Sequence, residues 1–308
     1  MEYINKSTKS LNANLDKKGL KKLIILPDYS PGKGRLPNGS VAIYSANEHS
    51  ISGEFLGPDI GCGMLLARFG ENLGDDLAYA NYGIFVKLRE ARQASLGSGN
   101  HFINIYKAET SNLPNLDKED NVVLIHSGSR LYGRDIFGKR LVGERYVEAH
   151  EHAQMFARQN RQKLLEIVME ASATETDTLL DIPHNTVELN NGEVIYRKGA
   201  VKLKPGEISI ISSYLGGKAI IVRAKPKIEE LEWSMCHGTG RKISRSDAKE
   251  IPFDSTELRK RIHIPNTIYD DSIDTEAPHC YRDIEEIFPR VEDYIEVVAE
   301  LKPLSYVS

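Results

Sequence analysis

Residues 57–64 read Gly-Pro-Asp-Ile-Gly-Cys-Gly-Met and place a carboxylate three positions before a cysteine in a glycine-rich turn. Glycine lets the backbone turn sharply, so Asp59 and Cys62 can close on one ion. Thiolate and carboxylate groups bind borderline divalent metals, and a thiolate can bridge two of them. The alternative is a buried structural cysteine, which is the usual state of a free thiol. Because glycines and an aspartate flank Cys62, we favour the metal site.

Four histidines elsewhere in the chain stand in comparable polar turns. The segments are Gly97-Ser98-Gly99-Asn100-His101-Phe102, His126-Ser127-Gly128-Ser129-Arg130, His184-Asn185 and His237-Gly238-Thr239-Gly240-Arg241. Each joins an imidazole to amide, hydroxyl, guanidinium or backbone N–H groups that suit a phosphate, and Gly97 to Gly99 can form an anion nest. A single histidine is more often structural than a ligand, but the repeated pairing favours function. The fold must bring these distant segments together.

The last of these turns contains a candidate nucleophile, His237. An imidazole that attacks a phosphoryl group needs open approach and nearby cations. His237 is followed by two glycines and Arg241, and then by Arg245. His150 and His152 lack such neighbours, and we expect both to face solvent.

The overall composition limits which partners the chain can bind. It has 308 residues and a net charge of −4, so nucleic acid can bind only through a local basic patch. Solvated surface charge is the alternative reading of the two candidate patches. They comprise Arg130, Arg134, Lys139 and Arg140, and Arg241, Lys242 and Arg245.

The sequence shows no pattern typical of a disulfide-rich, secreted or membrane protein. Three cysteines, at 62, 236 and 280, argue against a disulfide framework. Residues 1–6 lack the apolar region of a signal peptide, and no apolar run has membrane-spanning length. We therefore expect a soluble, cytoplasmic protein.

Short apolar runs between glycine, proline and asparagine clusters predict strands. A hairpin is expected at 190–192, where the sequence reads Asn-Asn-Gly. The expected strands are residues 22–26, which Pro27-Asp28 should end, 40–44, 64–69, 82–88, 122–125, 208–213 and 219–222.

Helical periodicity predicts the remaining elements. Apolar residues recur at helical spacing over 135–171, which indicates one long helix or two joined end to end, and again over 283–301. We expect a loop or surface helix at 244–274 and a weakly ordered lead-in or short helix at 1–20. The simplest interpretation is a single α+β domain over 21–308.

Taken in order, the motifs resemble the RtcB family of RNA-splicing ligases from about residue 24 to the end. Several short motifs in one order are more specific than any single motif. The resemblance implies mixed or antiparallel sheets around a central metal cleft, with a long helix. The matching motifs are Asp-Ile-Gly-Cys-Gly-Met, Gly-Ser-Gly-Asn-His-Phe, His-Ser-Gly-Ser-Arg, His-Asn, Arg-Lys-Gly-Ala, His-Gly-Thr-Gly-Arg with Ser-Arg, and Glu-Ala-Pro with Tyr.

The resemblance implies an RNA ligase that joins a 2′,3′-cyclic phosphate or 3′-phosphate end to a 5′-hydroxyl end. His237 would attack the α-phosphate of GTP and carry GMP, which passes to the RNA 3′-phosphate before the 5′-hydroxyl displaces it. Two Mn²⁺ ions are implied. Cys62 would bridge them, with Asp59 and His101 completing one site and His126 and His184 the other.

The resemblance also implies a set of residues around the nucleotide and RNA phosphates. Asp28 matches a family aspartate near the site. The implied nucleotide or phosphate contacts are Asn100, Arg130, Asn185, Lys198, Ser213, Gly238, Thr239, Gly240, Arg241, Arg245 and Tyr281.

This chain departs from the family pattern where the base would be read. Asn104 stands where the family has a glutamate, and Ser308 where it has a lysine near the end. Tyr29-Ser30-Pro31 replaces a histidine-containing turn, and the segments after Cys62 and after His184 are short. Because the carboxylate and ammonium groups for guanine are missing, we expect a relaxed or altered nucleotide preference.

Two other functions stay open. One is a Mn²⁺-dependent RNA-end phosphodiesterase that forms no histidine adduct, and the other is a catalytically silent RNA-binding paralogue. We expect a monomer that acts on RNA and contacts no membrane. A helper protein stays open as a further partner.

Overall fold

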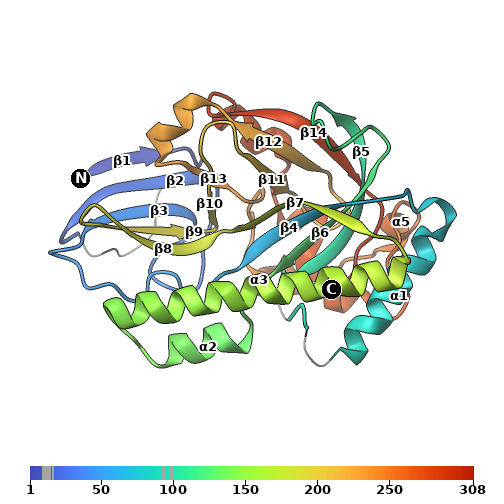
Figure 1. The fold of residues 1–308 in the computed structure, drawn as a ribbon, viewed down its shortest axis with the longest axis horizontal. Helices are drawn as coiled ribbons and strands as arrows, with labels where there is room; N and C mark the ends of the chain where they lie inside the picture. Colours follow the sequence, from blue (N-terminus) through green and yellow to red (C-terminus); the bar gives the residue numbers. More distant parts are fainter. Residues whose placement is uncertain (9–14, 16, 92–93, 98–99) are drawn as a thin grey trace.

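The computed structural model describes residues 1–8, 15, 17–91, 94–97 and 100–308. Two large β-sheets lie side by side, and one long helix, α3 (Glu144–Ser172), runs beneath both of them (Figure 1). The expected α+β class is confirmed. Among the described residues, no helix combines the length and the apolar character that a membrane crossing requires.

The first sheet has five strands in the order β1-β2-β3-β9-β8. β1 pairs with β2 in parallel, and the other neighbours are antiparallel. The hairpin predicted at 190–192 is confirmed, because Asn191 and Gly192 both have positive φ between β8 and β9. The strands are β1 (Glu2–Asn5), β2 (Leu20–Ser30), β3 (Asn38–Ser45), β8 (Asn185–Asn190) and β9 (Glu193–Lys198).

Two details of this sheet differ from the sequence-based expectation. β2 does not end at Pro27 but continues to Ser30, with a shift of pairing register between Ile25 and Ser30. The irregularity spans Asp28, which lies in the cavity wall described below. At the start of the chain, residues 2–5 form a strand where we expected a lead-in or short helix. Residues 9–14 and 16 lie outside the described part.

The second sheet has seven antiparallel strands in the order β11-β12-β14-β5-β6-β4-β7. The predicted strands at 64–69, 122–125 and 219–222 fall within it, and the one predicted at 208–213 ends one residue earlier, at Ser212. A separate small sheet pairs β10 (Ala200–Lys202) with β13 (Ser234–Cys236). The seven strands are β4 (Gly63–Phe69), β5 (Phe102–Ser111), β6 (Asn121–Ser127), β7 (Thr176–Pro183), β11 (Ile208–Ser212), β12 (Ala219–Ala224) and β14 (Ile295–Pro303).

The long helix predicted over 135–171 is confirmed as α3, which begins only at Glu144. The alternative of two helices joined end to end is wrong, because the separate helix α2 (Leu131–Gly138) packs beside α3 (Figure 1). The strand predicted at 82–88 is wrong, because these residues belong to helix α1 (Leu77–Glu90). Ala80 and Ile84 are four residues apart and buried, so one apolar face of α1 packs on α3. His150 is fully buried rather than solvent-facing, because it lies on the core side of α3, whereas His152 is exposed.

The terminal helix predicted over 283–301 is also wrong. Only α7 (Ile284–Ile287) forms, before a 3₁₀ turn that contains Pro289. The following residues form the inner strand β14, in which Ile295, Ala299 and Leu301 are fully buried. Irregular pairing beside Val298 interrupts the alternation of the strand, so Ile295, Val298 and Ala299 are buried at a spacing that imitates a helical repeat. The 3₁₀ segments are η1 (Gly74–Asp76), η2 (Pro226–Leu231), η3 (Asp274–Glu276), η4 (Pro278–Cys280) and η5 (Phe288–Arg290).

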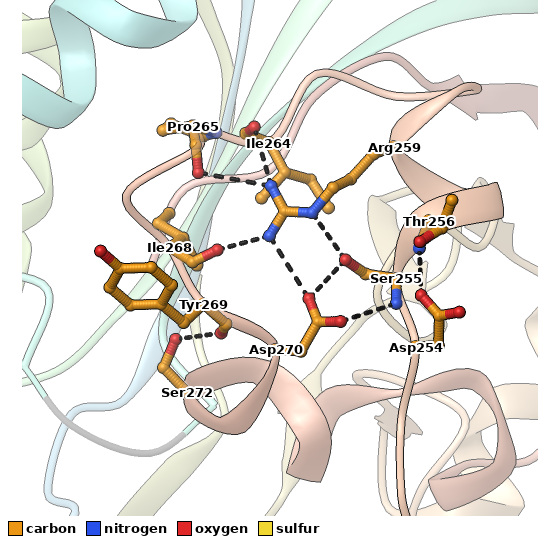
Figure 2. A network of polar contacts seen from close by, with 10 residues as sticks. All are labelled: Asp254, Ser255, Thr256, Arg259, Ile264, Pro265, Ile268, Tyr269, Asp270 and Ser272. Carbon is orange, nitrogen blue, oxygen red and sulfur yellow. Dashed lines mark hydrogen bonds and ion pairs between the residues drawn. The ribbon is translucent and has the colours of Figure 1, made fainter.

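Residues 244–274 form short helices joined by loops, as expected. Figure 2 shows the polar network that holds this segment around Arg259. The Arg259 guanidinium donates to the carbonyls of Ile264 and Pro265, at 3.2 and 3.5 Å, and lies 3.5 Å from an Asp270 carboxylate oxygen. The helices are α4 (Arg245–Lys249), α5 (Thr256–Arg259) and α6 (Asp270–Ile273).

Candidate metal centre and nucleotide cavity

A cavity of about 450 Å³ is lined by residues from both large sheets. β2 and β9 contribute Asp28 and Lys198, while β5 and β6 contribute Asn104 and His126. Most of the residues that the sequence singled out meet here. They are Asp28, Asp59, Cys62, Asn100, His101, His126, His184, Asn185, Lys198, Ser213, His237, Gly238, Thr239, Gly240, Arg241, Arg245 and Tyr281.

Arg130 is the predicted site residue that lies elsewhere. It lines an adjoining cavity of about 190 Å³, which also touches Asp59 and His101. Ser98 and Gly99, from the predicted anion nest, lie outside the described residues.

Strand order explains why the cysteine and two of the histidines meet. β4 lies between β6 and β7, and Gly63 at its start pairs with Ser127 on one side and Pro183 on the other. Cys62 therefore comes beside His126 at the end of β6 and His184 just after β7. The backbone N–H of His184 donates to the Cys62 carbonyl at 2.8 Å, which fixes the two segments.

The donor atoms of these side chains are closely spaced. Cys62 Sγ lies 3.2 Å from His126 Nε2 and 3.3 Å from His101 Nε2, and His126 Nε2 lies 3.4 Å from His184 Nε2. Cys62, His126 and His184 form a group whose donor atoms all lie within 4.8 Å of one another. Asp59 does not belong to this group, and it is exposed at the edge of the cavity.

These residues fit a divalent cation. Metal bonds of about 2.0–2.3 Å place neighbouring ligand atoms roughly 3–3.7 Å apart, which matches the observed spacing. Buried His184 Nδ1 finds no hydrogen-bond partner among the described residues. The His101 Nδ1 atom donates to the Leu96 carbonyl at 2.7 Å, so its Nε2 lone pair is directed at Cys62. Sulfur and imidazole together favour a borderline transition metal over Ca²⁺ or Mg²⁺.

Burial controls the charge of the ligand set. It lowers the pKa of His101 and, more strongly, the pKa values of His126 and His184, so the imidazoles are neutral and can donate lone pairs. Burial also raises the pKa of the Cys62 thiol, and the Asp59 carboxylate adds to the shift. A metal that binds Cys62 must therefore displace a proton.

His237 stands directly beside this group. Its ring centroid is 4.0 Å from that of His184. Nδ1 lies 2.9 Å from the Gly199 carbonyl oxygen and 3.3 Å from Asp28 Oδ2. Because a carbonyl only accepts hydrogen bonds, Nδ1 carries a proton, and Nε2 is the ring nitrogen that can offer a lone pair. The pKa of Asp28 is raised by burial, although His237 opposes the shift.

Asn185 and Lys198 are held differently from each other. The Asn185 amide joins two loops, because it donates to the Asp59 carbonyl at 2.9 Å and accepts from the Gly199 N–H at 2.9 Å. Lys198 points into the cavity wall, donates to the Lys33 carbonyl, and has its pKa lowered to about 8 by burial. Lys198 therefore offers a cation to a phosphate, whereas Asn185 chiefly fixes the loops.

A second charged cluster in the lining of this cavity surrounds Glu276. This carboxylate is buried, accepts a hydrogen bond from the Tyr281 hydroxyl, and lies 3.7 and 3.5 Å from Arg241 and Arg245. The sequence analysis missed Glu276 as a site residue. A signal was available, because the Glu-Ala-Pro motif follows two arginines that need a counter-charge.

Comparison with known proteins identifies the family to which this chain belongs. Residues 85–141 and 138–308 match the family model described as "tRNA-splicing ligase RtcB". This chain belongs to the RtcB family. The RtcB match includes His101, His126, His184 and His237, while Asp28, Asp59 and Cys62 lie before it and are placed by the geometry above.

Among curated RtcB proteins, the chain is 32% identical over 251 residues to RNA-splicing ligase RtcB1 of Escherichia coli, covering 68% of this chain and 59% of that protein. It is 28% identical over 318 aligned positions to RtcB2 of the same organism, covering 87% and 82%. It is 26% identical to tRNA-splicing ligase RtcB of Thermococcus kodakarensis, covering 71% and 60%. The match therefore spans about three fifths of RtcB1.

Proposed function

We propose that this chain is an RNA ligase that joins 2′,3′-cyclic phosphate or 3′-phosphate ends to 5′-hydroxyl ends through a nucleotide carried on His237. One observation carries the proposal. His237 donates its Nδ1 proton to the Gly199 carbonyl, and the centroid of its tilted ring lies 4.0 Å from that of His184 in the Cys/His group. Family membership supplies the substrate class.

We further propose that the Cys/His group, with His101 and Asp59, holds two Mn²⁺ ions. Cys62 would serve as a central ligand, because two imidazole nitrogens approach its sulfur at 3.2 and 3.3 Å. A divalent cation held there would neutralise negative charge that develops on a phosphoryl group.

Several residues have distinct roles in the first chemical step, the transfer of a nucleotide to His237. His237 Nε2 attacks the α-phosphorus of a nucleoside triphosphate, an N–P bond forms, the P–O bond to the β-phosphate breaks, and pyrophosphate leaves. The imidazole gains positive charge, which the Asp28 carboxylate beside Nδ1 stabilises. Lys198, Arg241 and Arg245 in the cavity wall neutralise phosphate charge.

The choice of base depends on Asn104. This side chain is buried in the cavity wall, donates to the Tyr106 hydroxyl at 3.2 Å, and has an amide oxygen with no partner among the described residues. A carboxylate at this position would offer only acceptors, whereas an amide offers an acceptor and a donor, the combination that pairs with adenine. We therefore propose that ATP is accepted as well as, or instead of, GTP.

Intact mass spectrometry tests the proposal. The chain is incubated with Mn²⁺ and either GTP or ATP, and RNA joining is measured in parallel with 3′-phosphate and 5′-hydroxyl ends. We expect one added nucleoside monophosphate and loss of both adduct and joining in His237→Ala. His152→Ala, an exposed histidine on α3, is the matched control and should behave like the parent.

The other two functions give different results in the same experiment. A phosphodiesterase would open cyclic phosphate ends without an adduct and would keep this activity in His237→Ala. A silent RNA-binding protein would form no adduct and join no ends. Strict use of GTP alone would contradict the altered nucleotide preference but leave the ligase proposal intact.

A further inference from the structure

Two consecutive polar residues, Asn160 and Arg161, are buried in the middle of the long helix α3. Asn160 is 4% exposed and Arg161 is 2% exposed. They lie on the face of α3 that carries the apolar residues Ala157 and Leu164. Burying a guanidinium is costly unless its donors are satisfied, so the contacts of this pair need an explanation.

Arg161 contacts each of the three segments that carry the Cys/His group. Its Nη1 atom donates to the carbonyl of Gly61 at 3.1 Å and to that of Ser127 at 3.0 Å. Its Nε atom donates to Asp181 at 2.6 Å. Gly61 precedes Cys62, Ser127 follows His126, and Asp181 lies on β7 three residues before His184.

Asn160 makes the corresponding contacts to the segment that supports His101. Its Nδ2 atom donates to the Ser95 carbonyl at 3.0 Å and to Ser127 Oγ at 2.9 Å, while its Oδ1 atom accepts from the Ser95 N–H at 3.1 Å. Ser95 immediately precedes Leu96, whose carbonyl accepts from His101 Nδ1. The two side chains therefore contact all four segments that position the sulfur and imidazole donors.

We propose that Asn160 and Arg161 are positioning residues that act as a clamp and set the spacing of Cys62, His101, His126 and His184. This inference rests on the metal-dependent function proposed above. A planar guanidinium has several donors in a fixed arrangement and can fasten three segments at once. A buried ion pair adds little net stability compared with an apolar pair, so stability alone does not explain Arg161 and Asp181.

The test removes the clamp without leaving a buried unpaired charge. In Arg161→Met/Asp181→Leu both charges are replaced by apolar side chains of similar size, which buried pairs often tolerate. We expect a cooperative fold with a thermal midpoint near that of the parent, but Mn²⁺ affinity, measured by calorimetry, reduced about 10- to 100-fold. The absorption spectrum of bound Co²⁺ should also change, because it reports ligand geometry.

Two further variants keep the test decisive. Asn160→Ala removes the other half of the clamp without touching a charge, and it should also weaken Mn²⁺ binding. Arg259→Met/Asp270→Leu is the matched control, because Arg259 also joins backbone carbonyls to an aspartate (Figure 2) but lies outside the segments that carry the donors. This control should bind Mn²⁺ like the parent.

The outcomes separate the clamp from the proposed function. Mn²⁺ affinities within about twofold of the parent, in a folded Arg161→Met/Asp181→Leu variant or in Asn160→Ala, would overturn the clamp alone. If the double variant does not fold, the Asn160→Ala result decides. Failure of the unaltered chain to bind Mn²⁺ would instead contradict the metal-dependent function, and the clamp with it.

Discussion

Lys198 carries a buried ammonium group in the cavity wall, and we predict that Lys198→Met stabilises the protein when no nucleotide or metal is bound. The residue is 3% exposed, and burial lowers the pKa of Lys198 from the ordinary 10.5 to about 8, even though the Asp59 carboxylate acts in the opposite direction. The folded state therefore bears a cost for keeping the charge, which methionine removes while filling similar space.

The size and sign of the effect follow from the two pKa values. At pH 7 lysine is protonated in both the folded and unfolded states, so the full cost is present. As the pH rises through about 8 the folded state releases its proton first, the unfolded state then binds more protons, and stability rises until about pH 10.5. The pKa difference corresponds to about 3 kcal/mol, so we expect Lys198→Met to gain about 1–3 kcal/mol at pH 7.

Urea unfolding of parent and variant, at pH 7 and again near pH 10, measures this difference in the free energy of unfolding. The advantage of the variant should shrink as the pH rises, since the parent lysine becomes neutral. Lys202→Met, an exposed lysine on β10, is the matched control and should change little. The reasoning is refuted if Lys198→Met is no more stable than the parent at pH 7, or if its advantage is independent of pH. Nucleotide adduct formation should fall in the same variant, because a phosphate loses its cation.

Other predictions concern the metal, the nucleophile and the base. Mn²⁺ should raise the thermal midpoint, and its affinity should increase about tenfold per pH unit between pH 6 and 8, because binding displaces the Cys62 proton; calorimetry with a chelator control measures both. Asp28→Asn should slow adduct formation at least about tenfold with unchanged Mn²⁺ affinity, since the carboxylate supports His237 and not the ligands; equal rates in single-turnover assays would contradict this role. Asn104→Glu should shift adduct formation from ATP toward GTP by about tenfold or more, as competition between the two nucleotides can show.

The sequence predicted the fold correctly in segments where the local pattern indicated only one kind of element. Residues 40–44 and 122–125 are apolar runs bounded by turn residues, and both are strands. Two of the failed predictions concern segments whose periodicity was ambiguous. Residues 82–88 form a short apolar run that suits either a strand or a helix, and packing of Ile84 against α3 decides for the helix. Residues 295–301 lie in an inner strand of a seven-stranded sheet, a long-range arrangement that no local pattern encodes.

Some residues of the candidate site could likewise be predicted from the sequence, and others could not. Cys62 and the four histidines could be recognised from the sequence because each lies within two residues of a glycine or an asparagine. Asn160 and Arg161 could not, because an asparagine and an arginine in a charged helix resemble solvated surface. A subtler signal existed. Arg161 continues the buried four-residue series of Ala153 and Ala157, and a cation on such a stripe needs a buried partner.

The electrostatics of the cavity lead to one more prediction, which concerns metal and nucleotide together. Burial disfavours the thiolate of Cys62 and the ammonium of Lys198 in the same cavity. A divalent cation stabilises the first, a phosphate stabilises the second, and the two ligands also attract each other. Each should therefore increase the affinity of the other, and thermodynamic linkage requires the same factor in both directions. Calorimetric titration of Mn²⁺ with and without a non-hydrolysable nucleotide, and of the nucleotide with and without Mn²⁺, measures that factor. Independent binding would mean that the two charges do not share one low-dielectric site.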